Sequence, residues 1–138
     1  MDCVFCAIVE GKAPAVVVYE DETTVAFMDI NPANPGHTLV IPKQHVRDIF
    51  AIDEETAVAV MRATVRVARA IEVALQPDGI NLIQANRRAA FQSVFHSHMH
   101  IIPRWWGDDI VLPWQPTPGD PAAIQSAAAR IREHIEEQ

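Results

Sequence analysis

Three histidines occupy alternate positions in the stretch QSVFHSHMHIIPR, which runs from Gln92 to Arg104. Because successive side chains of a β-strand point to opposite faces of a sheet, this alternation predicts a strand over Val94–Ile102. His96, His98 and His100 then share one face, about 6.6 Å apart at a rise of about 3.3 Å per residue. The residues predicted on the other face are Phe95, Ser97, Met99 and Ile101.

Such a row of histidines suits three chemistries. Two of them can hold a metal ion together with other ligands, or one imidazole can act as a nucleophile that its neighbours orient. The row can also form a pH-sensitive patch without catalysis. A single histidine is most often an inert side chain with satisfied hydrogen bonds. Three in strict alternation bring no packing benefit, which favours a functional role.

Four further strands and two helices are predicted. The long helix begins at the N-cap Asp53 and ends near Leu75. The second helix has Asp120 as its N-cap and Pro121 at its first position, and ends near Glu136. This order is typical of an α+β domain in which an antiparallel sheet of about five strands carries the helices on one side. The four strands are predicted at Val16–Tyr19, Thr24–Met28, His37–Ile41 and Ile80–Gln84.

The long helix has a narrow polar stripe and an apolar surface wider than one core requires. Deep burial in the core would account for that width, and so would a second partner such as another subunit. Both interpretations stay open at this stage.

Composition and length bound the kind of protein. The 138 residues correspond to one domain over 1–138, with 49% hydrophobic residues and a net charge of −7. This charge argues against broad binding to nucleic acid or an anionic membrane, but it leaves room for a small basic pocket. No apolar run approaches the roughly 20 residues that cross a bilayer, and the first residues lack the basic start of a signal peptide. We therefore expect a cytoplasmic protein.

The two cysteines, Cys3 and Cys6, form a C-x-x-C pair. In a reducing compartment a persistent disulfide is disfavoured, so the pair indicates metal binding or redox chemistry. By itself C-x-x-C supplies only half of a tetrahedral metal site.

The segments MDINPANPGHTLVIPK and QSVFHSHMHIIPR together resemble the histidine triad (HIT) family of nucleotide hydrolases and transferases. The resemblance spans nearly the whole chain. It implies an antiparallel sheet with two helices, assembled as a homodimer through a helix and a sheet edge. The motifs that carry it are C-x-x-C, F-x-D-I, P-G-H, I-P-K-x-H, Q-x-V-x-H-x-H-x-H and I-I-P-R.

The resemblance implies that His98 attacks the α-phosphorus of a nucleoside 5′-phosphate derivative. The resulting nucleotidyl-histidine is then hydrolysed to the nucleoside monophosphate, and this step needs no metal. Charge on the phosphoryl oxygens requires nearby donors. We expect His100 and His37 to provide the phosphate environment and Gln92 with Ser93 to lie on the leaving-group side.

The resemblance also implies a structural zinc ion held by two cysteines and two histidines. The ligands would be Cys3, Cys6, His45 and the first triad histidine, His96. The backbone carbonyl of His96 would orient the ring of His98. The alternative for the cysteines is a pair of buried or redox-active thiols.

Asp29 matches the family's ribose-binding acid, although it could instead cap the loop Asn31–Gly36. Asn86 is the recognisable remnant of the family's Asn-rich turn and is a second candidate for nucleotide contact. The expected ligand is a purine nucleotide. Three apolar residues are candidates for the base pocket and could equally be plain core: Phe5, Ile8 and Phe27.

The loop QANRRAAF departs from the family pattern, because Phe91 stands where glycine is usual. Arg87 and Arg88 either reach phosphate as charged donors or are ordinary exposed charges. These departures leave two alternatives to a nucleotide hydrolase. One is a nucleotide-binding regulatory protein with little turnover, and the other is a metallohydrolase that uses the triad as metal ligands.

Overall fold

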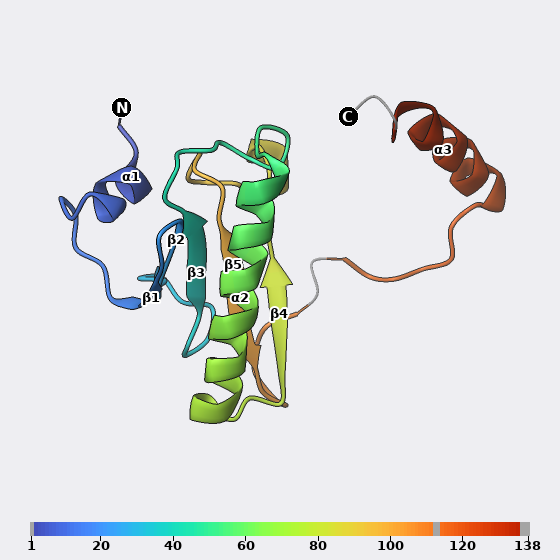
Figure 1. Cartoon of the computed structure of the whole chain (residues 1–138). Coiled ribbons are helices and arrows are strands. Elements are labelled where there is room, and N and C mark those ends of the chain that lie inside the picture. The colour runs from blue at the N-terminus through green and yellow to red at the C-terminus, as the bar shows by residue number, and fades with distance from the viewer. Residues whose placement is uncertain (1, 112–113, 136–138) are drawn as a thin grey trace. The chain divides into compact units, whose positions relative to one another are not determined.

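The structure is a computed structural model that describes residues 2–111 and 114–135. The chain forms two compact units, Met1–Asp108 and Asp109–Gln138, which are described separately. The second unit contains α3. The elements are α1 Val4–Val9, β1 Val17–Glu20, β2 Thr24–Met28, β3 Thr38–Pro42, α2 Glu54–Leu75, β4 Gly79–Ile83, a short 3₁₀ helix η1 Arg88–Ala90, β5 Met99–Arg104 and α3 Pro121–His134 (Figure 1).

The sheet has five strands in the order β1-β2-β3-β5-β4, and every neighbouring pair is antiparallel. This confirms the predicted α+β fold with an antiparallel sheet. β5 lies between β3 and β4, so that His100 pairs with Leu39 on one side and with Ile83 on the other. The triad segment therefore leads into an inner strand, while β4 forms one edge of the sheet.

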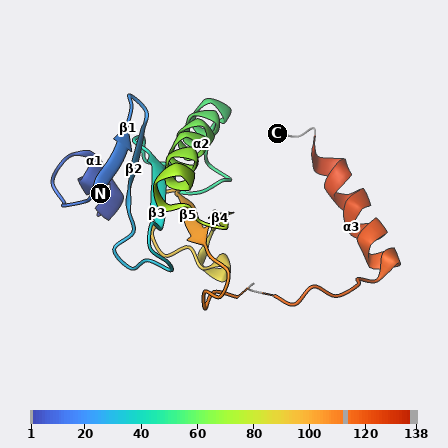
Figure 2. The ribbon, with the colours of Figure 1, turned by 90° about the horizontal axis from the view of Figure 1, so that it is seen from below.

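The two faces of the sheet carry different layers. On one face Ala26, Val40 and Ile101 pack against the buried stripe of α2. On the other face Phe5 of α1 packs against Phe27 and the neighbouring strand residues. Figure 2 shows α1 and α2 on opposite sides of β2 and β3. The sequence predicted the α2 layer but not α1, whose six residues are too short for a periodic pattern.

The predicted start of the histidine strand was wrong. β5 begins at Met99, so His96 and His98 lie in the irregular segment before it. There Ser97 donates its N–H to the carbonyl of Val46 at 2.6 Å, and the ring of His98 donates from Nδ1 to the carbonyl of His96 at 2.7 Å. A side chain that bonds nearby backbone competes with a regular strand ladder. The expected division of faces still holds at Ile101 and Met99, which lie with the α2 layer.

The helix predictions agree with the structure at three of their four ends. The carboxylate of Asp53 caps α2 by accepting the N–H of Thr56 at 2.7 Å, and the helix ends at Leu75. α3 begins at Pro121. Its predicted end near Glu136 lies outside the described residues. No helix in the described ranges is long and apolar enough to cross a membrane.

Gly36 lets the loop that precedes β3 pack closely against Leu75 and Pro103. Its φ of +88° lies in the left-handed region, and a β-carbon there would come 2.5 Å from Leu75 Cδ1 and 3.0 Å from Pro103 Cγ. Only glycine fits such a turn without strain and collision. The close approach fixes the backbone that delivers His37 to the site.

Candidate active site

A pocket of about 260 Å³ lies on the α1 side of the sheet. It brings together seven of the predicted site residues from three separate parts of the chain. A second, apolar pocket of about 350 Å³ lies beside α2 and carries no histidine, cysteine or carboxylate in its lining. The predicted residues that line the first pocket are Phe5, Ile8, Phe27, Asp29, Ser93, His98 and His100.

His98 is held with one ring nitrogen occupied and the other available. Its Nδ1 donates to the carbonyl oxygen of His96 at 2.7 Å, because a carbonyl can only accept. Nε2 therefore carries the lone pair. The edge-to-face contact with Phe5, at 5.1 Å between ring centroids, restrains the ring further. The side chain is 5% exposed, and this burial lowers the pKa of His98, so the imidazole is neutral at pH 7.

His100 and His37 form a chain of hydrogen bonds that fixes their tautomers. The N–H of Ala33 donates to His37 Nδ1 at 3.0 Å, which places the His37 proton on Nε2. That nitrogen donates to His100 Nδ1 at 2.9 Å, which leaves the His100 proton on Nε2. Burial, followed by the neighbouring His98 and His37, lowers the pKa of His100 to about 4. His100 is thus a neutral donor beside the His98 ring, 4.9 Å away between centroids.

Asp29 caps the following loop and also lines the pocket, while its role at a ribose stays a prediction. Its Oδ1 accepts the N–H of Asn31 at 2.8 Å and so caps the following loop. Its Oδ2 lies 3.4 Å from His37 Nε2, and the residue also lines the pocket. The carboxylate therefore stands at the pocket wall in a fixed orientation.

Gln92 and Asn86 hold loops together and do not line the pocket. The buried carboxamide of Gln92 donates to the carbonyl of Arg47 at 2.7 Å and accepts the N–H of Arg87 at 2.6 Å. Asn86 accepts the N–H of Ile49 at 2.8 Å. The roles assigned to both residues at the substrate stay predictions.

Phe91 keeps the backbone conformation that glycine favours, with a φ of +70°, and its side chain is 89% exposed. Arg87 also has a positive φ, of +72°. Left-handed backbone costs a non-glycine residue about 1 kcal/mol or more. The loop therefore retains its turn without glycine, and the bulky Phe91 side chain is directed into solvent.

Cys3, Cys6, His45 and His96 form a compact cluster of ligand atoms, all within 4.8 Å of one another. Cys6 Sγ lies 3.3 Å from His45 Nδ1 and 3.6 Å from His96 Nδ1, and Cys3 Sγ lies 3.5 Å from His96 Nδ1. Tetrahedral zinc with the usual bond lengths separates sulfur from nitrogen by about 3.5 Å. The donor set and spacing therefore fit such an ion.

The ring of His96 is oriented for this cluster from its other side. Its Nε2 donates to the carbonyl of Pro42 at 2.7 Å, which leaves Nδ1 free of a proton and facing the sulfurs. Without a metal, burial and the neighbouring Cys3 raise the pKa of the Cys6 thiol, so metal binding displaces a proton there.

A second group of metal-compatible side chains comprises Asp29, His37 and His100. The 2.9 Å between the two histidine nitrogens is a hydrogen-bond distance with both tautomers accounted for. This group is therefore explained without an ion.

Several groups at the site carried no signal in the sequence. The carbonyl of Pro42 and the N–H of Ala33, which set the tautomers of His96 and His37, are backbone atoms that any residue supplies. Only the folded chain brings them to the rings.

The class of protein is defined by an antiparallel α+β domain with a histidine cluster beside a pocket of about 260 Å³. The profile of the HIT domain matches residues 10–105. A HIT family protein from Bacillus subtilis has 38% identity and a TM-score of 0.91, covering 98% of both chains. The chain belongs to the HIT family.

Two further solved structures bear on the site. A protein described as a Zn-bound histidine triad family protein from Mycobacterium smegmatis has 40% identity and a TM-score of 0.77, covering 96% of this chain and 97% of its own. A histidine triad nucleotide-binding protein from Candida albicans has 25% identity and a TM-score of 0.87, covering 99% of both chains.

The lowered pKa of His100 makes stability depend on pH in a defined window. The unfolded chain binds this proton near pH 6.5 and the folded chain only near pH 4, so stability falls as the pH drops between these values. In His100→Asn the fall should be shallower. The slope of the unfolding free energy against pH can differ between the two proteins by at most about 1.4 kcal/mol per pH unit, the limit for one proton. Because the ring is only partly buried, the expected difference is smaller.

Urea unfolding of both proteins at several pH values between 4 and 7.5 measures this difference. Protonation of the cysteine and histidine cluster affects both proteins alike, so it cancels in the comparison. Equal pH slopes for wild type and His100→Asn would show that His100 titrates normally.

Proposed function

We propose that the protein hydrolyses nucleoside 5′-phosphate derivatives at the α-phosphorus through a covalent nucleotidyl intermediate on His98. The observation that carries this proposal is the bond from His98 Nδ1 to the His96 carbonyl. It leaves a neutral imidazole in a buried wall of the pocket with the Nε2 lone pair available. Such a nitrogen is a nucleophile at neutral pH.

The pocket offers matching places for the parts of a nucleotide. Phe5, Ile8 and Phe27 provide an apolar wall for a purine, and the Asp29 carboxylate can accept hydrogen bonds from the ribose hydroxyls. The α-phosphate then meets His98 and His100. Ser93, which lines the same pocket, is available to the leaving group.

The chemical steps follow from the tautomers. The lone pair of His98 Nε2 forms a bond to phosphorus while the bond to the leaving group breaks and its electrons depart with that group. The ring becomes positively charged, so the Nδ1 hydrogen bond to the His96 carbonyl strengthens as the reaction proceeds. His100 donates its Nε2 proton to a phosphoryl oxygen as a hydrogen bond. Water then attacks phosphorus, the P–N bond breaks with its electron pair returning to Nε2, and the attacking water loses a proton to solvent. The products are the nucleoside monophosphate and the neutral imidazole.

Zinc is the ion we propose for Cys3, Cys6, His45 and His96, where it would act as a structural centre. By binding His96 it would tie α1 and the loop after β3 to the residue whose carbonyl orients His98. No chemical step passes through it.

A homodimer is the proposed assembly. β4 is an edge strand, and apolar side chains lie exposed on it and on α2, among them Leu82 at 45%, Val58 at 55% and Val73 at 78%. A second copy would cover this surface. Light scattering should therefore give twice the chain mass of 15.3 kDa, whereas a mass of one chain would contradict the dimer.

A nucleotide-binding regulatory protein with little turnover is the second candidate. The strained loop that carries Arg87 and Phe91 in place of a glycine-rich turn favours it. Both candidates bind nucleotide, but only the first forms the covalent adduct.

His98→Ala should abolish adduct formation and lower turnover by at least about 10³-fold, because it removes the nucleophile. Turnover is read as monophosphate release from adenosine phosphoramidates, dinucleoside polyphosphates and nucleotide sugars. The adduct is read by mass spectrometry after rapid acid quench. His134→Ala, in the separate second unit, is the control and should behave as wild type.

Near-normal turnover by folded His98→Ala would refute the mechanism. Absence of both adduct and turnover in the wild type would favour the regulatory protein. If a chelator abolished turnover in protein that stays folded, the metallohydrolase interpretation would replace the proposal.

Cys3→Ser combined with Cys6→Ser should lower zinc content and melting temperature together, the latter by about 5 °C or more. Cys3 Sγ also caps α1 by accepting the N–H of Cys6. A serine hydroxyl can accept the same bond, so the loss reports the metal and not the cap. His98→Ala should keep about one zinc per chain.

Metal analysis and thermal melting of these two variants decide the point. Wild-type protein that holds no zinc after purification with zinc and without chelator would remove the site. Loss of zinc in His98→Ala would show that the triad itself binds the metal.

A further inference from the structure

Three arginines gather beside the candidate active site although the chain carries a net charge of −7. Arg47 and Arg88 lie over the ring of Phe95, with Cζ 5.4 Å and 5.6 Å from its centroid. Arg87 lies over Phe50 at 4.3 Å. Among the residues that the structure describes, none of the three pairs with a carboxylate. We call Arg47, Arg87 and Arg88 the arginine cluster.

The backbone that carries the arginine cluster is held in place by Gln92. The Gln92 carboxamide bonds the carbonyl of Arg47 and the N–H of Arg87, so it joins the loop after β3 to the loop before β5. Stacking on Phe95 and Phe50 restrains the guanidinium groups themselves. The positive charges are therefore positioned in advance, and within the described part of the chain none of them forms an ion pair with a carboxylate.

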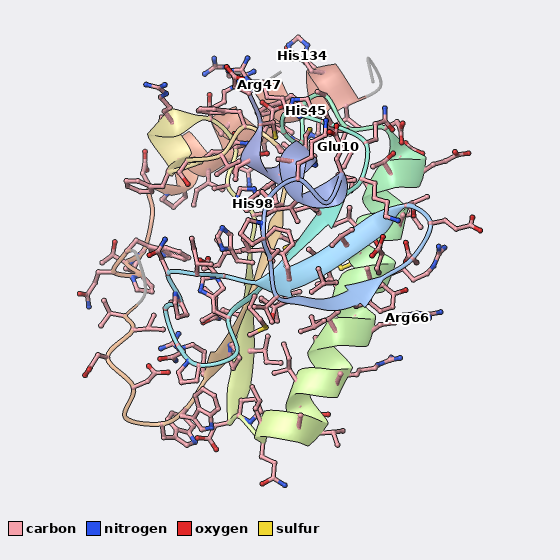
Figure 3. The ribbon with its side chains drawn as sticks, turned by 90° about the vertical axis from the view of Figure 1, so that its left-hand side faces the viewer. Glu10, His45, Arg47, Arg66, His98 and His134 are labelled. Atoms are coloured by element: carbon pink, nitrogen blue, oxygen red, sulfur yellow. The ribbon has the colours of Figure 1, made fainter. Side chains whose placement is uncertain are left out.

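Phe95, on which two of the arginines stack, lines a pocket that adjoins the pocket of His98 and that Cys3 and His45 also line. A neighbouring pocket of about 380 Å³ is lined by Phe95 and shares Val4, Ser93 and Val94 with the pocket of His98. Figure 3 shows Arg47 and His45 at the same end of the molecule, above His98. Ser93, which the proposed function assigns to the leaving-group side, lines both pockets, whereas Asp29 and Phe27 line only the first. A leaving group that extends past Ser93 would therefore enter the neighbouring pocket.

We propose, on the basis of the function proposed above, that the arginine cluster binds further phosphates of the leaving group. The substrate class is then a nucleoside polyphosphate, such as a dinucleoside polyphosphate, in preference to a phosphoramidate. The planar guanidinium fork matches phosphate oxygens bidentately. When His98 bonds to the α-phosphorus, the bridging oxygen departs with the electron pair. Its negative charge then develops beside the arginines.

Asp2 would favour the opposite preference, for a phosphoramidate with an amine leaving group. Its carboxylate borders the same pocket and would favour a cationic amine leaving group. The three arginines would repel such a group. Substrates that differ only beyond the α-phosphate therefore separate the two outcomes.

Binding tests the cluster without turnover. AMP ends at the α-phosphate, whereas ATP extends two phosphates beyond it. In calorimetry without magnesium, wild type should bind ATP more tightly than AMP, with a steeper dependence on salt. Arg47→Gln combined with Arg88→Gln should weaken ATP binding by about 5- to 30-fold and change AMP binding by less than about twofold. Arg69→Gln, an exposed arginine on α2 at the opposite face, should change neither.

Turnover provides the second readout. The double variant should lower kcat/KM for diadenosine tetraphosphate by a similar factor and leave adenosine phosphoramidate within about twofold. The salt dependence of the wild type and the single variant Arg88→Gln keep the test available if the double variant does not fold.

Equal affinity for ATP and AMP in the wild type, or equal losses for both ligands in the double variant, would overturn the proposed subsite. The proposed subsite would also be overturned if the double variant kept the wild-type ratio of kcat/KM values for diadenosine tetraphosphate and adenosine phosphoramidate. If ATP and AMP behave as expected but no adduct forms on His98, the subsite stands and the proposed hydrolysis fails.

Discussion

The hydrogen bond from His98 Nδ1 to the carbonyl oxygen of His96, 2.7 Å long, fixes the arrangement of the candidate active site. His96 takes part in both the cysteine and histidine cluster and the orientation of His98. The ring of His96 faces the two cysteine sulfurs, anchored by the Pro42 carbonyl, while its backbone oxygen fixes the tautomer of His98. The bond also breaks the regular strand, which is why β5 begins only at Met99. The cysteine and histidine cluster and the ring of His98 are thereby joined through a single residue, His96.

The layers of the fold explain why this arrangement lies in a pocket. α2 buries Ala26, Val40 and Ile101 on its own face of the sheet. The opposite face is covered by the short α1, which brings Phe5 against His98 and leaves the space beside it open. Cys3 caps α1 and Cys6 lies in its first turn, so a metal ion held by these cysteines would stabilise the wall of the pocket as well as His96.

Much of the fold followed from the sequence because strand alternation and helix caps are local signals. Asp53 caps α2 as predicted, and β2 has the predicted bounds. The start of the triad strand did not follow, since the bond between the His98 ring and the His96 carbonyl overrides periodicity. The packing of Gln92 between two loops was equally hidden, because a buried amide and a substrate-facing amide look alike in sequence. The family resemblance, more than spacing, directed attention to Cys3, Cys6, His45 and His96.

The central claim is that His98 is neutral and protonated on Nδ1 before substrate arrives. Nitrogen NMR of protein labelled with ¹⁵N in its histidines tests this directly, with His98→Ala used to assign the signals. The account predicts the Nδ1–H tautomer for His98 at pH 7, and a pKa below that of an ordinary histidine, since burial lowers the pKa of this ring. An Nε2–H tautomer, or an imidazolium at pH 7, would contradict it.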